Sequence, residues 1–153
     1  MAKIRIYLDN STYNRPFDDK KQLTIKMEAE AKLQIQEDIR NGIYELVWSY
    51  MNEYENNENP YDDKREAISV WTNIAGIKCP PNEEILEKGK KIQHIGIKPK
   101  DSLNLACAIE SGCRFFITTD KTLLKKADFF SEIEIVNPID FIRKKEEANG
   151  RNN

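Results

Sequence analysis

Short apolar runs alternate along the chain with longer segments in which apolar residues recur every three or four positions. The short runs are rich in β-branched and aromatic residues and end at turn-forming residues, which is typical of buried β-strands. Four segments fit this description: 4–8 (IRIYL), 43–48 (IYELVW), 114–119 (RFFITT) and 133–136 (IEIV). Strands of this kind, separated by helices, predict an α/β domain with a central, mainly parallel sheet that is buried on both faces.

The segments between these strands have helical periodicity and recognisable end signals. The longest, 20–41, has no Gly or Pro, and its apolar residues recur at every fourth position: Met27, Ala31, Ile35 and Ile39. Further helices are predicted over five segments: 50–57, 62–75, 82–96, 101–111 and 121–127. Ser49 and Asn82 stand where N-caps are preferred, whereas Gly89 weakens the prediction of one unbroken helix around it. Residues 79–81 (CPP) predict a turn.

The chain has the length of one ordinary domain, at 153 residues, with no internal repeat and no linker long enough to divide it. We expect this domain to span residues 1–142. Residues 143–153 (RKKEEANGRNN) are almost entirely polar and predict a disordered tail. No apolar run approaches the ~18 residues of a membrane-spanning helix, and the first residues contain no apolar stretch of the kind that secretory signals need.

Charge and cysteine content narrow the function classes. Lys and Arg number 24 against 26 Asp and Glu, so the net charge of −2 does not by itself indicate a nucleic-acid-binding protein. Lysines do cluster at 88–100 and at 121–126, although a solvated face explains each cluster equally simply. Three cysteines without a CxxC pair, and a single histidine, make a zinc site or a disulfide framework unlikely, and they favour a reducing, cytosolic setting.

Carboxylates stand where two of the predicted strands end. Asp9 follows the first strand and Asp120 follows the strand 114–119, so a parallel sheet would bring both to its carboxyl edge, where open α/β sheets bind ligands. Glu55 and Asp101 lie on helices next to these strands. Each acid taken singly is a plausible turn or cap residue. Several converging carboxylates, however, repel one another unless protons or a cation neutralise them, and their hard oxygens suit Mg²⁺ or Mn²⁺.

The order of these motifs resembles the PIN-domain family over residues 3–142. The strongest match is the segment KPKDSLNLACAIESGCRFFITTDKTLL, in which an acid starts a helix of small residues that is followed by Gly, a strand and Thr-Thr-Asp. The segment LDNSTYNRP after the first strand is the second match. The resemblance implies a PIN-like three-layer α/β/α sandwich and a metal-dependent ribonuclease, and it includes VapC-like toxins of bacterial toxin–antitoxin pairs.

The resemblance also implies a set of site residues. The metal-binding and catalytic acids would be Asp9, Glu55, Asp101 and Asp120, with Mg²⁺ or Mn²⁺ as cofactor. The second of these is the weakest match, since Glu53 competes with Glu55 in an unusual, Tyr-rich segment. We expect three hydroxyl groups to orient the acids or their waters: those of Ser11, Ser49 and Thr118.

Four basic residues near these acids are candidates for contacts with the RNA backbone: Arg15, Lys98, Lys100 and Lys121. For Arg15 an ion pair with Asp18 or Asp19 within its own loop is an equally good interpretation.

The sequence therefore predicts a cytoplasmic, divalent-metal-dependent endoribonuclease that hydrolyses RNA phosphodiester bonds by metal-activated water. The toxin resemblance adds an antitoxin as a partner. The alternative is a PIN-like binding module without nuclease activity, because a fold does not fix a function. The chain has no GxGxxG or GxxxxGK[ST] motif, which leaves a nucleotide-binding domain unsupported. A homodimer through exposed aromatic residues is a further prediction, weighed against their filling the core: Trp48, Tyr54 and Trp71.

Overall fold

Five parallel strands form the central sheet of the computed structural model, which describes residues 3–151. Their order is β3-β2-β1-β4-β5. Their bounds are Ile4–Leu8 (β1), Tyr44–Ser49 (β2), Ile77–Cys79 (β3), Phe115–Ile117 (β4) and Glu134–Val136 (β5). The order reverses at β1, because β2 and β3 lie on one side of it and β4 and β5 on the other. Open α/β sheets bind ligands at such a switch point, so the crevice between β1 and β4 is the first place to look for a site.

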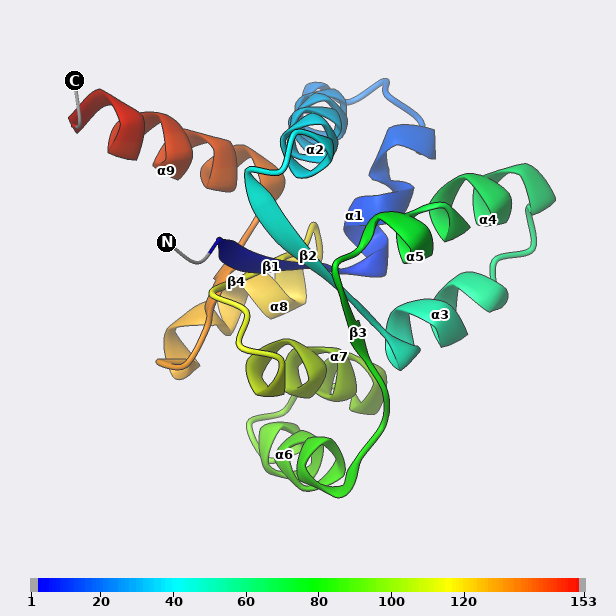
Figure 1. The fold of residues 1–153 in the computed structure, drawn as a ribbon, viewed down its shortest axis with the longest axis vertical. Helices are drawn as coiled ribbons and strands as arrows, with labels where there is room; N and C mark the ends of the chain where they lie inside the picture. Colours follow the sequence, from blue (N-terminus) through cyan, green and yellow to red (C-terminus); the bar gives the residue numbers. More distant parts are fainter. Residues whose placement is uncertain (1–2, 152–153) are drawn as a thin grey trace.

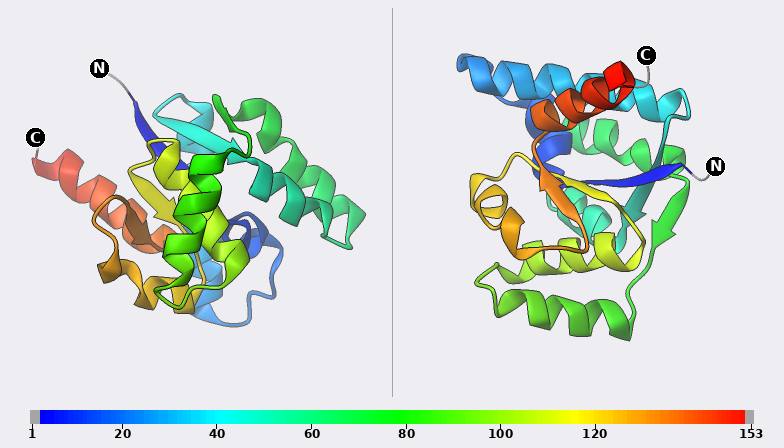
Figure 2. Two further views of the ribbon diagram at one scale, coloured as in Figure 1. Left: turned by 90° about the horizontal axis from the view of Figure 1, so that it is seen from below. Right: turned by 90° about the vertical axis from the view of Figure 1, so that its left-hand side faces the viewer.

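Helices cover both faces of this sheet, as Figures 1 and 2 show. One face packs against α2 (Leu23–Arg40), α4 (Asp62–Ser69), α5 (Trp71–Ile74) and α9 (Pro138–Arg151). The other packs against α6 (Glu83–Gln93), α7 (Pro99–Glu110) and α8 (Lys121–Lys125). Short elements follow the strand ends: α1 (Asn10–Asn14), η1 (Arg15–Phe17), α3 (Tyr50–Asn57) and η2 (Ala127–Phe129). This is the predicted three-layer α/β/α sandwich. In the part of the chain that the structure describes, no helix is long and apolar enough to cross a membrane.

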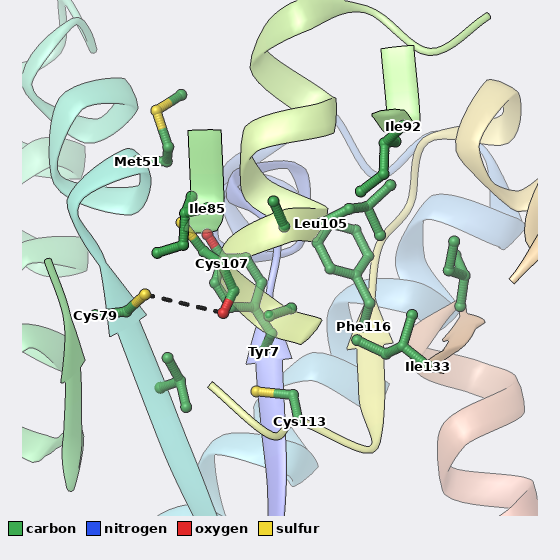
Figure 3. Close-up of a cluster of buried hydrophobic side chains, with 14 of the residues drawn as sticks. Tyr7, Met51, Cys79, Ile85, Ile92, Leu105, Cys107, Cys113, Phe116 and Ile133 are labelled. Carbon is green, nitrogen blue, oxygen red and sulfur yellow. Dashed lines mark hydrogen bonds between the residues drawn. The ribbon is translucent and has the colours of Figure 1, made fainter. Parts of the chain in front are cut away.

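The two faces carry separate hydrophobic cores because successive side chains of a strand point to opposite sides. Along β1, Ile6 and Leu8 are buried under α2, whereas Tyr7 between them is buried against α7. Figure 3 shows the second of these cores, where the ring of Tyr7 stacks on that of Phe116 with 5.3 Å between centroids. Both strands of the switch point, β1 and β4, are thus packed against hydrophobic cores on both faces of the sheet.

The four predicted strands are confirmed as β1, β2, β4 and β5. The remaining strand, β3, was not predicted. This strand has only three residues, and its neighbours Pro80 and Pro81 predicted a turn instead. The predicted helix 62–75 is also divided, since α4 ends at Ser69 and α5 begins at Trp71. In contrast, α6 is unbroken despite Gly89. A Cβ at that position would lie 3.0 Å from a methyl carbon of Leu103, so the missing side chain lets α6 approach α7 closely.

The buried face of α2 differs from the predicted one. Met27 is 44% exposed, and polar residues share the buried face with apolar ones. Lys32 lies 5.4 Å from the ring centroids of both Tyr13 and Trp71. Asp38 forms an ion pair of 2.5 Å with Lys145 of α9. The hydrophobic pattern was right for Ile35 and Ile39, which are buried, but it wrongly placed Met27 on the buried face and missed the buried polar residues.

The expected disordered tail is instead helical as far as Arg151. The helix α9 continues through residues 143–151, and Lys144 and Lys145 form ion pairs with Glu134 and Asp38. These partners lie far away in the sequence or on another element, so the tail's composition gave no sign of them. Residues 152–153 lie outside the described residues, and the division of the chain at 142 stays a prediction.

Two of the three aromatic residues proposed for self-association are not at the surface. Trp48 and Trp71 are 4% and 2% exposed and fill the core under α4 and α5, which contradicts a role for them in a dimer. Tyr54 is 51% exposed.

We expect the core between the sheet and α7 to carry much of the stability. Leu105 is fully buried there, and its substitution to Ala should lower the free energy of unfolding of the protein by about 3 kcal/mol. Leu86, on the outer side of α6 and 47% exposed, is the matched control, and its substitution to Ala should change stability by no more than about 0.5 kcal/mol. Urea unfolding measures both. Equal losses in the two variants would contradict the layer assignment.

Candidate functional site

Asp9 lies at the switch point itself, directly after β1. Its backbone N–H donates to the carbonyl of Ile117 at the end of β4 (3.0 Å), so the chain leaves both strands at the same place. The Asp9 side chain, 5% exposed, caps α1 by accepting from the backbone N–H of Asn10 (2.8 Å). Its other oxygen accepts from the hydroxyls of Thr118 (2.7 Å) and Ser11 (3.0 Å). Three donors, from the segments that follow β1 and β4, therefore fix this carboxylate.

The same hydroxyls connect Asp9 to Asp120. Thr118 accepts from the backbone N–H of Asp120 (3.0 Å), and Ser11 accepts from that of Thr119 (3.1 Å). One oxygen of Asp120 caps α8 by accepting from the N–H of Thr122 (2.8 Å). Ser11 and Thr118 thus contact the acids they were predicted to orient.

A chain of buried hydrogen bonds connects the carboxylate of Glu55 to the protein core. Its carboxylate accepts from the side-chain amide of Asn104 on α7, and the amide oxygen of Asn104 in turn accepts from the hydroxyl of Tyr7. Ser49, which caps α3, shares a hydrogen bond of 2.6 Å with that same hydroxyl. Ser49 therefore reaches Glu55 only through two other side chains.

Glu53 points elsewhere. Its carboxylate accepts from the indole N–H of Trp48 (2.9 Å) and from the hydroxyl of Thr72 (3.3 Å), on the side of α5. Of the two competing acids of α3, Glu55 is the one that faces Asn104 and the switch point.

Asp101 lies in the first turn of α7 and is half-buried. It faces the carboxyl edge of the sheet where Asp9 and Asp120 lie, which is called the rim below. Among residues 3–151, no hydrogen bond or ion pair engages its carboxylate. Burial and the charges of Asp9 and Asp120 raise its pKa to about 6, while Lys98 lowers it.

The four acids share one electrostatic environment. Burial raises the pKa of Glu55 to about 7, with further increases from the charges of Asp9 and Asp101. Burial also raises the pKa of Asp9, against the hydrogen bonds from Thr118 and Ser11 that lower it, and the charge of Asp120 adds to the increase. Each of these shifts includes the charge of another acid of the set. Asp9, Glu55, Asp101 and Asp120 therefore lie near enough to one another for their charges to interact.

Comparisons with family models and with curated proteins found no match. Solved structures do match. A member of the VapBC family of toxin–antitoxin systems, VapBC-5 from Mycobacterium tuberculosis, aligns with a TM-score of 0.56 and 13% identity over 87% of this chain and 98% of that chain. VapBC2 from Rickettsia felis, bound to a DNA fragment from their promoter, aligns with a TM-score of 0.55 and 11% identity over 88% and 98%. The chain has a PIN-like fold.

At 11–13% identity these neighbours establish the PIN-like fold, and the fold alone. The resemblance that the sequence motifs indicated is confirmed at this level. Which residues of this PIN-like chain act, and on what, rests on its own side chains.

The acids of the PIN-like rim suit a hard divalent cation in their chemistry. Four carboxylates offer oxygen ligands, and the pKa values of three of them are raised by burial and by the charges of the other acids. In the described part of the chain, however, no three Asp, Glu, His or Cys side chains are already arranged as ligands of one ion. The carboxylate oxygens suit such a cation chemically, and the acidic side chains would have to change their positions to bind one together.

Two of the four predicted backbone-binding residues form ion pairs within the PIN-like domain. Arg15 forms ion pairs with Asp18 (3.0 Å) and Glu28 (3.3 Å), which is the loop-holding role weighed against RNA contact. Lys100 pairs with Glu58 (3.2 Å).

Lys98 immediately precedes α7, and Lys121 begins α8 directly after Asp120. The charge of Lys98 lowers the pKa of Asp101, so Lys98 lies near the acids in space as well as in sequence. The charge of Lys121 acts on Glu28 of α2.

Sequence reasoning missed the support beneath Glu55. Asn104 is fully buried although it stands between Leu103 and Leu105 in an apolar stretch. An isolated Asn in such a stretch is the one feature of the sequence that could have indicated a buried polar contact. Asn52 was missed as well. Its amide donates to the carbonyl of Leu8 and to the side chain of Asn10 (both 3.1 Å), and so attaches α3 to the end of β1.

The shared environment predicts the pH dependence of the metal-free protein. Glu55 and Asp101 have raised pKa values in the folded state, so the folded chain binds more protons than the unfolded chain between roughly pH 4 and pH 7. The unfolding free energy should therefore decrease as pH rises through this window. Urea unfolding in a chelator at about pH 5.5 and about pH 7.5 measures the difference, which Glu55→Gln should reduce.

The control is Glu53→Gln, which removes a carboxylate from the same helix but outside the rim. It should keep the wild-type difference between the two pH values. An undiminished difference in Glu55→Gln would show that Glu55 does not share the acidic environment.

Proposed function

We propose that the chain is a divalent-metal-dependent endoribonuclease that hydrolyses phosphodiester bonds of RNA. The observation that carries the proposal is that Asp9 and Asp120 follow the two strands of the switch point, while burial and the charges of neighbouring acids raise the pKa values of Asp9, Glu55 and Asp101. A bound Mg²⁺ or Mn²⁺ would neutralise the scissile phosphate and supply an activated water.

Each acid has a proposed role that follows from its surroundings. Asp9, Asp101 and Asp120 hold the cation. Glu55, with a pKa raised to about 7, either joins them as a ligand or accepts the proton of the attacking water, which suits a group that titrates near neutral pH. Thr118 and Ser11 keep Asp9 in place through their hydroxyls.

The RNA backbone would cross the rim between α7 and α8. Lys98 and Lys121 flank the acids there and offer positive charge to phosphates without reading bases. Lys100 and Arg15 can contribute only by exchanging their present carboxylate partners for phosphate.

We further propose that the chain is the toxin of a toxin–antitoxin pair. Both structural neighbours come from VapBC systems, which supports a protein antitoxin as partner. Such a partner would inhibit cleavage by covering the acidic rim.

The second candidate function is a PIN-like binding module without nuclease activity. The observation in its favour is that the acids are not arranged as ready ligands among residues 3–151. Metal binding and cleavage, measured separately, distinguish the two candidates.

Substitution of the central acids should abolish cleavage. We expect Asp9→Asn and Asp101→Asn to reduce metal-dependent RNA cleavage more than about 100-fold, since each removes a charged ligand of the cation. Glu53→Gln, which changes an acid outside the rim, should cleave like the wild type. Cleavage of a labelled oligoribonucleotide in Mn²⁺ measures the rates, and melting curves show whether the variants are folded. Retained cleavage by a pure, folded Asp9→Asn protein would refute the assignment.

Metal binding should stabilise the folded chain independently of any activity. At an ion concentration about 100 times the Kd, Mn²⁺ or Mg²⁺ should raise the melting temperature by about 5–10 °C, because the ion binds only the native state. Asp101→Asn should lose this shift, whereas Glu53→Gln should retain it. If neither ion shifts the wild-type melting temperature, the binding-module function is the better account.

A further inference from the structure

A cleft of about 340 Å³ opens beside the acids, and its lining includes Ser11 and Glu55. It lies between the α1–η1 segment and the connection from α3 to α4. The amide of Asn59 donates to the side-chain oxygen of Asn14 across it (3.2 Å) and ties the two walls together. The helix α1 contacts both α3 and α4, and Figure 1 shows it where β1 ends, at the carboxyl edge of the sheet. Whatever enters this cleft is therefore held next to Glu55.

Two aromatic rings line the cleft and are open to solvent. Tyr61, just before α4, is 59% exposed, and Phe17 of η1 is 40% exposed. The ammonium group of Lys64 lies 4.2 Å from the centroid of the Tyr61 ring, which is a cation–π contact. An exposed ring fixed in this way offers a flat surface on which another planar group can stack.

The charges of the lining favour a neutral occupant. Three carboxylates line it, but Asp18 is paired with Arg15 and Glu58 with Lys100. Lys64 is the single basic residue among the lining side chains, and its ammonium group lies over the Tyr61 ring, so the lining is close to neutral and offers no cluster of positive charge for a phosphate. The amide groups of Asn10, Asn14 and Asn59 instead offer hydrogen-bonding atoms of the kind that base edges use. Rings, amides and a volume at the lower end of ligand pockets fit one nucleobase with its sugar.

We propose that this cleft binds one unpaired nucleobase of the RNA, next to the scissile phosphate, with the ring of Tyr61 as its stacking surface. The proposal rests on the proposed nuclease function. A base inside a duplex is stacked on both sides and cannot enter, so the cleft would select single-stranded RNA at the cleavage position.

The test combines a protein variant with a modified substrate. A set of single-stranded oligoribonucleotides carries one abasic nucleotide at successive positions around the cleavage site. With the intact oligonucleotide, Tyr61→Ala should raise KM about tenfold with little change in kcat, as expected when one base–aromatic stack is lost. Tyr61→Phe keeps the ring and should behave like the wild type. Phe129→Ala removes a 66% exposed ring that does not line the cleft and serves as the matched control.

The abasic series locates the base. In the wild type one abasic position should raise KM as much as Tyr61→Ala does, and at that position the variant should cause no further increase, because both changes remove the same stack. A KM of Tyr61→Ala within about twofold of the wild type, or an equal further increase at every abasic position, would overturn the proposal.

Failure of the nuclease function is separable from failure of this cleft. If the wild type cleaves no RNA, equilibrium binding of single-stranded oligoribonucleotides that carry one 2-aminopurine at successive positions replaces KM as the readout. Quenching that Tyr61→Ala abolishes and Phe129→Ala retains supports the cleft without any cleavage. The same quenching in both variants, or none in the wild type, refutes it.

Discussion

The repulsion between carboxylates at one edge of the sheet is the constraint on which the rest of this structure depends. Parallel topology brings the ends of β1 and β4 together, and with them Asp9 and Asp120. The helices α3 and α7 add Glu55 and Asp101, whose pKa values are raised by burial and by the charge of Asp9. A chain gains no stability from such an arrangement. Under the proposed function a bound cation would neutralise these charges and make the arrangement favourable.

The surrounding structure compensates for this repulsion with local hydrogen bonds and large packed layers. Asp9 accepts from three side-chain and backbone groups near the switch point, and Glu55 accepts from Asn104, which Tyr7 and Ser49 support from the core. Beneath them, the two cores on opposite faces of β1 hold the strand rigidly. The acids are thus oriented by groups whose own positions are fixed by packing. A cleft with exposed rings then continues the same rim toward α4.

The sequence predicted the parts of this arrangement that are local. Asp9 and Asp120 follow directly from strands that end beside them, and a parallel sheet leaves little choice about where strand ends lie. The choice between Glu53 and Glu55 was out of reach, because it depends on the side chains α3 faces: Trp48 and Asn104 belong to other elements. The helix over residues 143–151 and the buried face of α2 are joined by the ion pair between Asp38 and Lys145, which are 107 positions apart. Such long-range pairs leave no periodic trace in the sequence.

The central claim is that these carboxylates together bind one divalent cation. The most direct measurement is the anomalous scattering of Mn²⁺ in crystals of the chain grown or soaked with that ion. The account predicts a peak at the β1–β4 switch point within bonding distance of oxygens from Asp9 and at least one of Glu55, Asp101 and Asp120. A well-ordered rim with no peak at saturating Mn²⁺, or a peak only at other carboxylates, would contradict it.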